Sequence, residues 1–173
     1  MNLNLFFTPT DILLPAHADM RRWSVIACDQ FTADAGYWQA VQDTVCDAPS
    51  TLRLMLPEFY LGKCDEAAAT REIQQTMRRY LDDGVFRTVP HSLVLVQRTL
   101  PGGAVRCGVV GALDLEAYDY APDSVTPIRA TEGTVASRLP ARVRIRAAAA
   151  LEMPHIMVFY SDPEDRSEDR RVG

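Results

Sequence analysis

The sequence lacks several features that would assign it to a class of protein at once. No stretch of the 173-residue chain approaches the ~20 uninterrupted apolar residues of a membrane-spanning helix. Its four cysteines are too few for a scaffold built from disulfides, and no C-x-x-C pair indicates a zinc or thioredoxin-type site. The three histidines are scattered without metal-ligand spacing. We therefore expect no membrane span, and we assign none of the cysteines or histidines as a metal ligand.

An excess of basic charge is also absent. The chain has 18 basic and 23 acidic residues and a net charge of −5, which argues against general binding to nucleic acids. Neither a Walker A loop nor a G-x-G-x-x-G fingerprint occurs. The first residues lack the basic region that opens a secretory signal. Because unpaired cysteines are typical of a reducing compartment, we expect a cytoplasmic protein.

What is present is the composition of a folded domain. Hydrophobic residues make up 47% of the chain and charged residues 24%, values typical of globular proteins. No linker divides the chain, so we expect one domain over residues 1–163. Residues 164–173 are almost entirely charged or polar, and we expect them to form a disordered tail.

Helix signals occur at two places in the first half of this domain. Asp34 is positioned to cap a helix that reaches about residue 46, and Asp65 to cap a second helix over residues 66–83 that ends before Gly84. The second helix would bury a stripe of apolar residues at helical spacing: Ala69, Ile73, Met77 and Leu81.

Strand signals surround these helices. Short apolar runs predict three buried strands, over residues 23–28, 52–56 and 155–160. Residues 92–100 and 104–115 predict a β-hairpin around the turn of residues 101–103, and Gly108 and Gly111 indicate a bulge or a close backbone approach. The whole pattern predicts an α/β or α+β fold, a single domain with a mixed β-sheet that contains one hairpin and is flanked by helices.

The strongest local charge lies between residues 128 and 146. One acid, Glu132, stands there among Arg129, Arg138, Arg142, Arg144 and Arg146. In a helix Arg138, Arg142 and Arg146 would share one face, and in an extended chain Arg142, Arg144 and Arg146 would do so. Either stripe could bind phosphate or carboxylate through paired hydrogen bonds. The alternative, with equal weight, is a solvated face that pairs with acids elsewhere, such as Asp114, Glu116, Asp119 and the tail.

The turn of residues 131–134 precedes this stripe. Gly133 would let the backbone approach a ligand closely, and Thr134 could cap a following helix, an arrangement that favours phosphate binding. Glu132 could hold a metal ion or act as a base. Pro140 would either break the segment or take position N1 of a helix that reaches Glu152.

A second polar cluster follows the first expected strand. Asp29 lies at that strand's end, where α/β folds place reactive groups, and is a candidate base or metal ligand. The alternative is an aspartate that only forms the turn. Cys28 is a weaker candidate for a nucleophile, because the sequence places no histidine to activate it. Glu58, after Pro57, offers a further carboxylate.

Several collinear blocks of the chain resemble a known family. The first reads Trp23-Ser-Val-Ile-Ala-Cys-Asp-Gln-Phe-Thr32, and the others are residues 37–38, 49–52, 56–58, 128–134, 138–142 and 151–156. Together they cover about residues 8–163 and resemble a bacterial and archaeal family catalogued as a domain of unknown function, DUF 1015. That family is similar to an ADP-dependent free-serine kinase and, through it, to the ParB and sulfiredoxin-like nucleotide-binding fold.

The resemblance implies phosphoryl transfer to a small hydroxyl substrate, with Mg²⁺ and ADP or ATP as cofactors. Asp29 and Glu132 would be catalytic. The phosphate or nucleotide would be bound by Arg129, Thr131, Gly133, Thr134, Arg138 and Arg142.

The family also implies that part of such a kinase is missing here. Its members run beyond this length and carry an Asp-Gly-His/Asn-His-type motif that is absent from this chain. We therefore expect the truncated, N-terminal part of a nucleotide-dependent small-molecule kinase of the serine type. The alternatives are a non-catalytic regulatory module that binds an anion or a nucleotide, and a fragment with no independent activity. The oligomeric state is not predicted.

Overall fold

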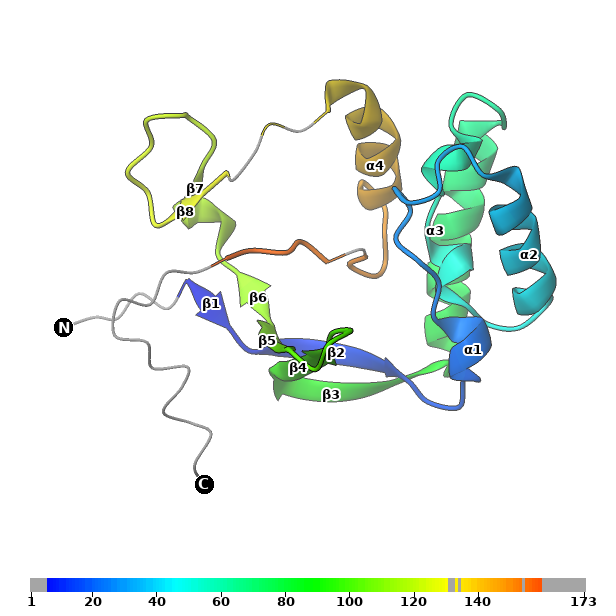
Figure 1. Cartoon of the computed structure of the whole chain (residues 1–173), viewed down its shortest axis with the longest axis horizontal. Coiled ribbons are helices and arrows are strands. Elements are labelled where there is room, and N and C mark those ends of the chain that lie inside the picture. Colours follow the sequence, from blue (N-terminus) through cyan, green and yellow to red (C-terminus); the bar gives the residue numbers. More distant parts are fainter. Residues whose placement is uncertain (1–5, 131–132, 134, 154, 160–173) are drawn as a thin grey trace.

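The computed structural model describes residues 6–130, 133, 135–153 and 155–159 (Figure 1). The helices are α1 (Met20–Trp23), α2 (Ala35–Val45), α3 (Glu66–Asp82) and α4 (Leu139–Arg146). Short 3₁₀ segments lie at Thr51–Leu54, Glu58–Tyr60, Leu115–Ala117 and Ala136–Arg138. The strands are β1 (Phe7–Thr8), β2 (Thr10–Pro15), β3 (Phe86–Ser92), β4 (Val94–Thr99), β5 (Val105–Val110), β6 (Ala112–Leu113), β7 (Tyr118–Asp119) and β8 (Ile128–Arg129).

Within the described residues the strands pair in four two-stranded ladders. The ladders β1–β6, β2–β3 and β4–β5 are antiparallel, and β7–β8 is parallel. The expected hairpin is confirmed, because β4 and β5 pair in register from Val94 opposite Val110 to Thr99 opposite Val105. The combination of helices with small antiparallel ladders confirms the α+β class. Figure 1 shows α1, α2 and α3 grouped on one side, with α4 beside α3.

The two expected helices begin where their caps predict. The Asp34 carboxylate accepts a hydrogen bond from the Tyr37 N–H at the start of α2. The Asp65 carboxylate accepts from the N–H groups of Ala67 and Ala68 at the start of α3. After α3 the chain turns at Gly84, whose φ of +66° is a left-handed conformation that glycine adopts without strain.

The core lies among the helices. One buried cluster contains Trp23, Leu54, Ile73, Met77, Tyr80, Ile145 and Leu151, and a second contains Trp38, Val45 and Leu52. The stripe expected on α3 is confirmed for Ile73 and Met77, whereas Leu81 is 39% exposed. Tyr80 takes the buried place one residue earlier, and its hydroxyl accepts a hydrogen bond from the Ser50 N–H at 3.0 Å.

The strands expected over residues 23–28 and 52–56 are wrong. Trp23 ends α1, and Thr51–Leu54 is a 3₁₀ turn capped by Ser50. Side chains replace the strand partner here: the hydroxyls of Ser50 and Thr51 donate to the Trp23 carbonyl, and the Val25 N–H donates to the Thr51 hydroxyl. A short apolar run cannot distinguish a strand from another buried segment.

The expectations for the last third are corrected in part. Pro140 lies in the first turn of α4, as the helical alternative predicts, but α4 ends at Arg146 and does not reach Glu152. Residues 155–159, expected as a core strand with residue 160, form no strand, and Ile156 and Met157 are 71% and 78% exposed. Residue 160 and the tail of residues 164–173 lie outside the described part of the chain, and the domain boundary stays a prediction.

None of the helices in the described part of the chain combines the length and the apolar character that crossing a bilayer requires.

Candidate functional site: a carboxylate held by two arginines

The arginine-rich segment meets a buried carboxylate. Arg138, which precedes α4, and Arg142, within it, lie one turn apart and both contact Glu58. Arg138 Nε lies 3.2 Å from Glu58 Oε2, and Arg142 Nη2 lies 2.7 Å from Glu58 Oε1. We call these three residues the Glu58 cluster. The helical alternative for the stripe is thereby confirmed for Arg138 and Arg142.

The acidic side chain of the Glu58 cluster is much more buried than its two basic side chains. The Glu58 side chain is 6% exposed, while those of Arg138 and Arg142 are 44% and 41% exposed. One buried negative charge therefore faces two half-exposed positive charges. A guanidinium group carries five N–H donors, more than one carboxylate shared by two arginines can accept, so further donors of both groups remain. The cluster has an excess of positive charge at the surface and can accept another anion.

The Asp29 segment lies beside the same cluster. The Glu58 N–H donates to the Cys28 carbonyl at 2.8 Å, which joins the two segments through their backbones. Burial raises the pKa of the Cys28 thiol, the charge of Arg142 lowers it, and the charges of Asp29 and Glu58 raise it, with a net rise. These four side chains therefore share one electrostatic neighbourhood. The Asp29 carboxylate is exposed and accepts a hydrogen bond from Gln30 Nε2 at 3.1 Å.

The other arginines of α4 pair with different acids. Arg144 forms an ion pair with Glu66, whose other oxygen accepts from the Gly62 N–H, and Arg146 lies 2.7 Å from Glu152. The alternative of pairing with acids elsewhere is therefore confirmed for Arg144 and Arg146, as it is for Arg138 and Arg142 with Glu58. The partners are Glu58, Glu66 and Glu152, and the expected partners Asp114, Glu116 and Asp119 are not among the ion pairs of the described residues.

The remaining residues expected to bind phosphate are not gathered at this cluster. Arg129 is exposed on β8, which Figure 1 shows apart from α4. Gly133 is exposed, and a Cβ added there would meet no atom within 4 Å. Thr131, Glu132 and Thr134 lie outside the described residues, so their expected roles stay predictions.

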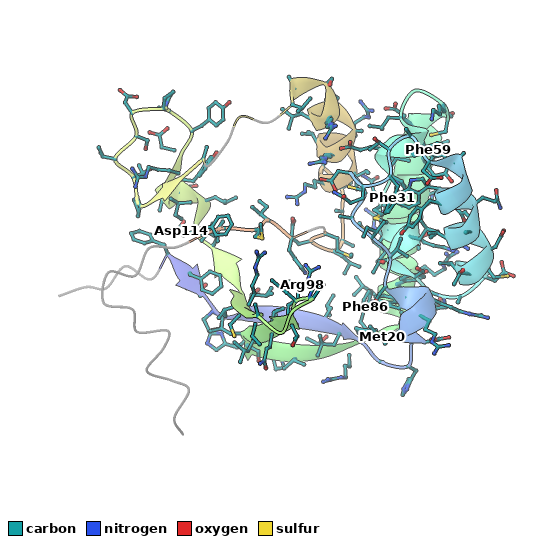
Figure 2. All side chains as sticks on the ribbon, viewed as in Figure 1. Met20, Phe31, Phe59, Phe86, Arg98 and Asp114 are labelled. Atoms are coloured by element: carbon teal, nitrogen blue, oxygen red, sulfur yellow. The ribbon has the colours of Figure 1, made fainter. Side chains whose placement is uncertain are left out.

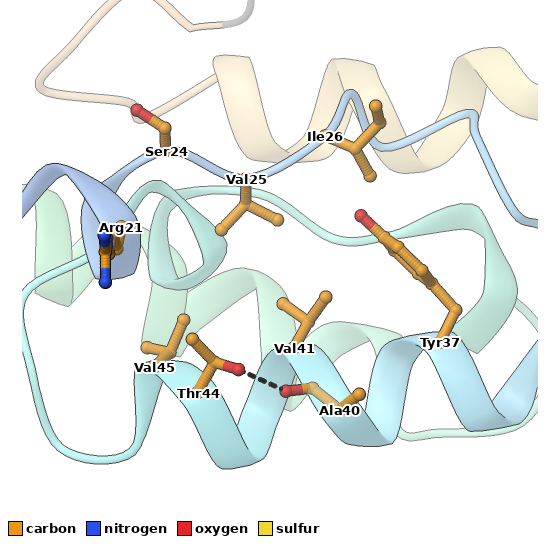
Figure 3. A pocket seen from close by; sticks show the side chains of 9 residues that line it. All are labelled: Arg21, Ser24, Val25, Ile26, Tyr37, Ala40, Val41, Thr44 and Val45. Carbon is orange, nitrogen blue, oxygen red and sulfur yellow. Dashed lines mark hydrogen bonds between the residues drawn. The ribbon is translucent and has the colours of Figure 1, made fainter.

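Two surface hollows do not include the side chains of the Glu58 cluster. One, of 190 Å³, lies between α2 and the segment of residues 24–26 (Figure 3). Tyr37 and Ile26 stand at one end of it and Arg21 at the other. The second, of 160 Å³, is lined by Pro57 and Tyr60 on either side of the Glu58 backbone, together with residues of α2 and α3.

Sequence reasoning missed one feature near Asp29. The ring of Phe31 stacks on that of Tyr37, with centroids 4.0 Å apart and planes 13° apart. Phe31 has a φ of +50°, a conformation that non-glycine residues rarely adopt. A single sequence carries no signal for a strained φ at phenylalanine, and the stack across six residues follows from that turn.

Comparison with known proteins identifies a family for this chain. The family model described as "Protein of unknown function (DUF1015)" matches residues 9–170. Neither the curated proteins nor the solved structures contain a match.

Proposed function

We propose that this chain, which belongs to the DUF1015 family of proteins of unknown function, binds a phosphorylated small molecule at the Glu58 cluster. One observation carries the proposal: two half-exposed arginines are oriented by a single buried carboxylate. Glu58 fixes both guanidinium groups before a ligand arrives, so less side-chain entropy is lost on binding. The uncompensated charge of the pair is the part that a phosphate would neutralise.

Phosphate fits this arrangement better than a single carboxylate does. Guanidinium groups bind phosphate oxygens through paired, charge-assisted hydrogen bonds. A phosphoryl group offers oxygens to both arginines at once. Its negative charge is larger than the excess positive charge of the Glu58 cluster. A nucleotide is the phosphorylated ligand that the family resemblance implies.

Magnesium enters this proposal only with the ligand. Within the described residues no three or more His, Cys, Asp or Glu side chains gather where they could hold a metal ion. Glu58 is already engaged by both arginines. These residues do not fit a Mg²⁺ site built by the protein alone, and we derive no step through the ion. Phosphate oxygens of a nucleotide are themselves common Mg²⁺ ligands.

A calorimetric titration with inorganic pyrophosphate tests the proposal. We expect binding to the 173-residue chain, and a loss of about ten- to a hundredfold in affinity for Arg138→Gln and for Arg142→Gln, the range for a charged hydrogen bond. Arg144→Gln is the matched control. It removes the same positive charge from α4, but from an arginine that pairs with Glu66 rather than with Glu58. Absence of binding by a chain that unfolds cooperatively would contradict the proposal and favour a fragment without independent activity.

Phosphoryl transfer is a second candidate, favoured by the position of Asp29 beside the cluster. In that reaction a substrate hydroxyl oxygen would form a bond to the terminal phosphorus of the nucleotide while the bond to the departing nucleoside phosphate breaks. Asp29 would accept the hydroxyl proton, and Arg138 and Arg142 would stabilise the charge on the transferred group.

The two candidates predict different behaviour of Asp29→Asn. If the chain transfers phosphate, incubation with ADP or ATP, Mg²⁺ and free serine yields phosphoserine, and Asp29→Asn abolishes that product without weakening pyrophosphate binding. If it only binds, no phosphoserine forms with either protein. Turnover that survives in Asp29→Asn would remove Asp29 from the mechanism.

We place the protein in the cytoplasm within the same proposal. All four cysteines are free thiols, and Cys46, Cys64 and Cys107 are exposed, which suits a reducing compartment.

A further inference from the structure

Phe31 is an exposed aromatic ring held in a strained turn. The residue is 48% exposed, and its φ of +50° lies in the left-handed region, where a β-carbon is unfavourable. Strain of this kind costs about 1–3 kcal/mol and gathers at ligand sites, where the surrounding structure maintains it. Glycine or asparagine at this position would relieve the strain and leave less apolar surface in water.

The core maintains the turn through the Phe31 carbonyl. That oxygen accepts a hydrogen bond from Trp38 Nε1 at 3.0 Å and another from the Asp34 N–H at 3.1 Å. Trp38 is fully buried, so the turn is anchored to the interior while Phe31 itself stays partly exposed. Tyr37 supports the ring from one side at 4.0 Å. The partial exposure of Phe31 leaves ring surface for another planar group.

A short stretch of chain joins Phe31 to the Glu58 cluster. Phe31 follows Cys28 by three residues, a length of chain that spans at most about 11 Å, and the Cys28 carbonyl accepts the Glu58 N–H. Figure 2 shows Phe31 in the region between α4, which carries Arg142, and α2, which carries Tyr37. A ligand that reaches both features would have a planar ring at one end and a phosphate at the other.

We infer that Phe31, backed by Tyr37, is a stacking platform for the planar aromatic ring of the phosphorylated ligand. This inference rests on the proposed function and narrows its ligand to a nucleotide-like molecule, in which a heterocyclic base is joined through a sugar to phosphate. Stacking recognises the flat face of the ring and tolerates different bases, because every base presents a π-face. The arginines supply the phosphate contacts, and Phe31 adds selectivity for ligands that carry a ring.

A comparison of ADP with inorganic pyrophosphate isolates the ring contribution, because both present two linked phosphoryl groups. For the unaltered chain we expect calorimetry to show ADP binding about tenfold more tightly than pyrophosphate. Phe31→Gly should abolish that preference and leave pyrophosphate affinity unchanged. This variant keeps the backbone contacts to Trp38 and Asp34, and glycine favours the positive φ. Far-UV circular dichroism and a thermal melt check that it folds.

Two further variants complete the test. Arg138→Gln should lower the affinities for ADP and for pyrophosphate by the same factor. Tyr120→Ala removes another aromatic residue, which is 63% exposed. It should change neither the ADP affinity nor the pyrophosphate affinity. Pyrophosphate binding without a preference for ADP, or a preference that survives in Phe31→Gly, would overturn this inference alone. Absence of pyrophosphate binding would overturn the proposed function and this inference with it.

Discussion

Glu58 is the residue on which the proposed site depends. It is nearly excluded from solvent, whereas the two arginines that contact it are half-exposed. Removing the arginines would leave a carboxylate without a cation in a poorly hydrated place. Removing the carboxylate would leave two cations that water can still solvate. The free-energy cost of breaking the cluster is therefore asymmetric.

This asymmetry predicts different stabilities for two sets of variants. The double variant Arg138→Gln/Arg142→Gln should lower the free energy of unfolding by about 2–3 kcal/mol, because the Glu58 charge loses both partners. Glu58→Gln should lower it by about 1 kcal/mol or less, because its amide still accepts hydrogen bonds. Urea unfolding curves measure both. Equal losses for the two sets would show that Glu58 is better hydrated than its burial indicates.

Cys28 offers a second test at this scale, through its reactivity at different pH. Burial raises the pKa of its thiol, so at pH 7 to 9 a smaller fraction is thiolate than in an ordinary cysteine. Iodoacetamide should therefore modify Cys28 more slowly than the exposed Cys46, and raising the pH should speed the reaction. Mass spectrometry of digested samples measures both rates. In 6 M urea the two rates should converge; equal rates in the folded protein would contradict the burial of Cys28.

At the scale of elements, the features predicted correctly were those that local signals specify. Carboxylate caps at Asp34 and Asp65 fixed the starts of α2 and α3, and two glycines fixed the hairpin turn. The short runs at residues 23–28 and 52–56 were misread because their partners are hydroxyl groups of Ser50 and Thr51 rather than another strand. Side-chain partners of this kind depend on the tertiary fold.

The candidate site, too, was predicted in part from local signals and depends in part on the tertiary fold. Helical spacing predicted Arg138 and Arg142 on one face as one of two alternatives, and α4 decided between them. Their acid partner could not be identified, because Glu58 is separated from Arg142 by 84 positions and several other acids were equally plausible from the sequence. The positive φ of Phe31 carried no sequence signal at all.

Gly111, between β5 and β6, supports a prediction about one element. The close approach expected there is confirmed: an added Cβ would lie 2.7 Å from side-chain atoms of Leu93 and Phe7 and 2.8 Å from the Thr8 carbonyl oxygen. Gly111→Ala should therefore lower the free energy of unfolding by about 1–3 kcal/mol, the usual cost of overpacking. Gly108→Ala is the control, because a Cβ there meets nothing within 4 Å. Equal thermal stability of the two variants would show that β1 and β6 separate easily.

At the scale of the whole molecule, the buried apolar side chains are concentrated in the part that contains the helices. The described residues with buried apolar side chains lie between Trp23 and Tyr80 and between Ala141 and Leu151. The hairpin of β4 and β5 contributes none of them, and Leu95 and Val109, opposite each other on it, are 73% and 53% exposed. Figure 1 shows this hairpin separate from the helices.

This distribution predicts uneven local stability. Regions with few buried contacts open at a small free-energy cost, whereas core helices open only when the molecule unfolds. Amide hydrogen exchange, followed by mass spectrometry, should therefore be at least about tenfold faster in β4 and β5 than in the middle of α3. Comparable protection in the two regions would indicate that something covers the hairpin in solution.

The sequence separation between Glu58 and Arg142 has a consequence for how the protein reaches its native state. Closing a long loop carries an entropy cost before its contacts form, so such contacts tend to arise late in folding. We expect pyrophosphate binding to return after the helical signal when the denatured chain is diluted into buffer, in a stopped-flow experiment that follows both. Since the ligand would bind only chains in which this loop has closed, its presence would draw the folding equilibrium toward them by mass action.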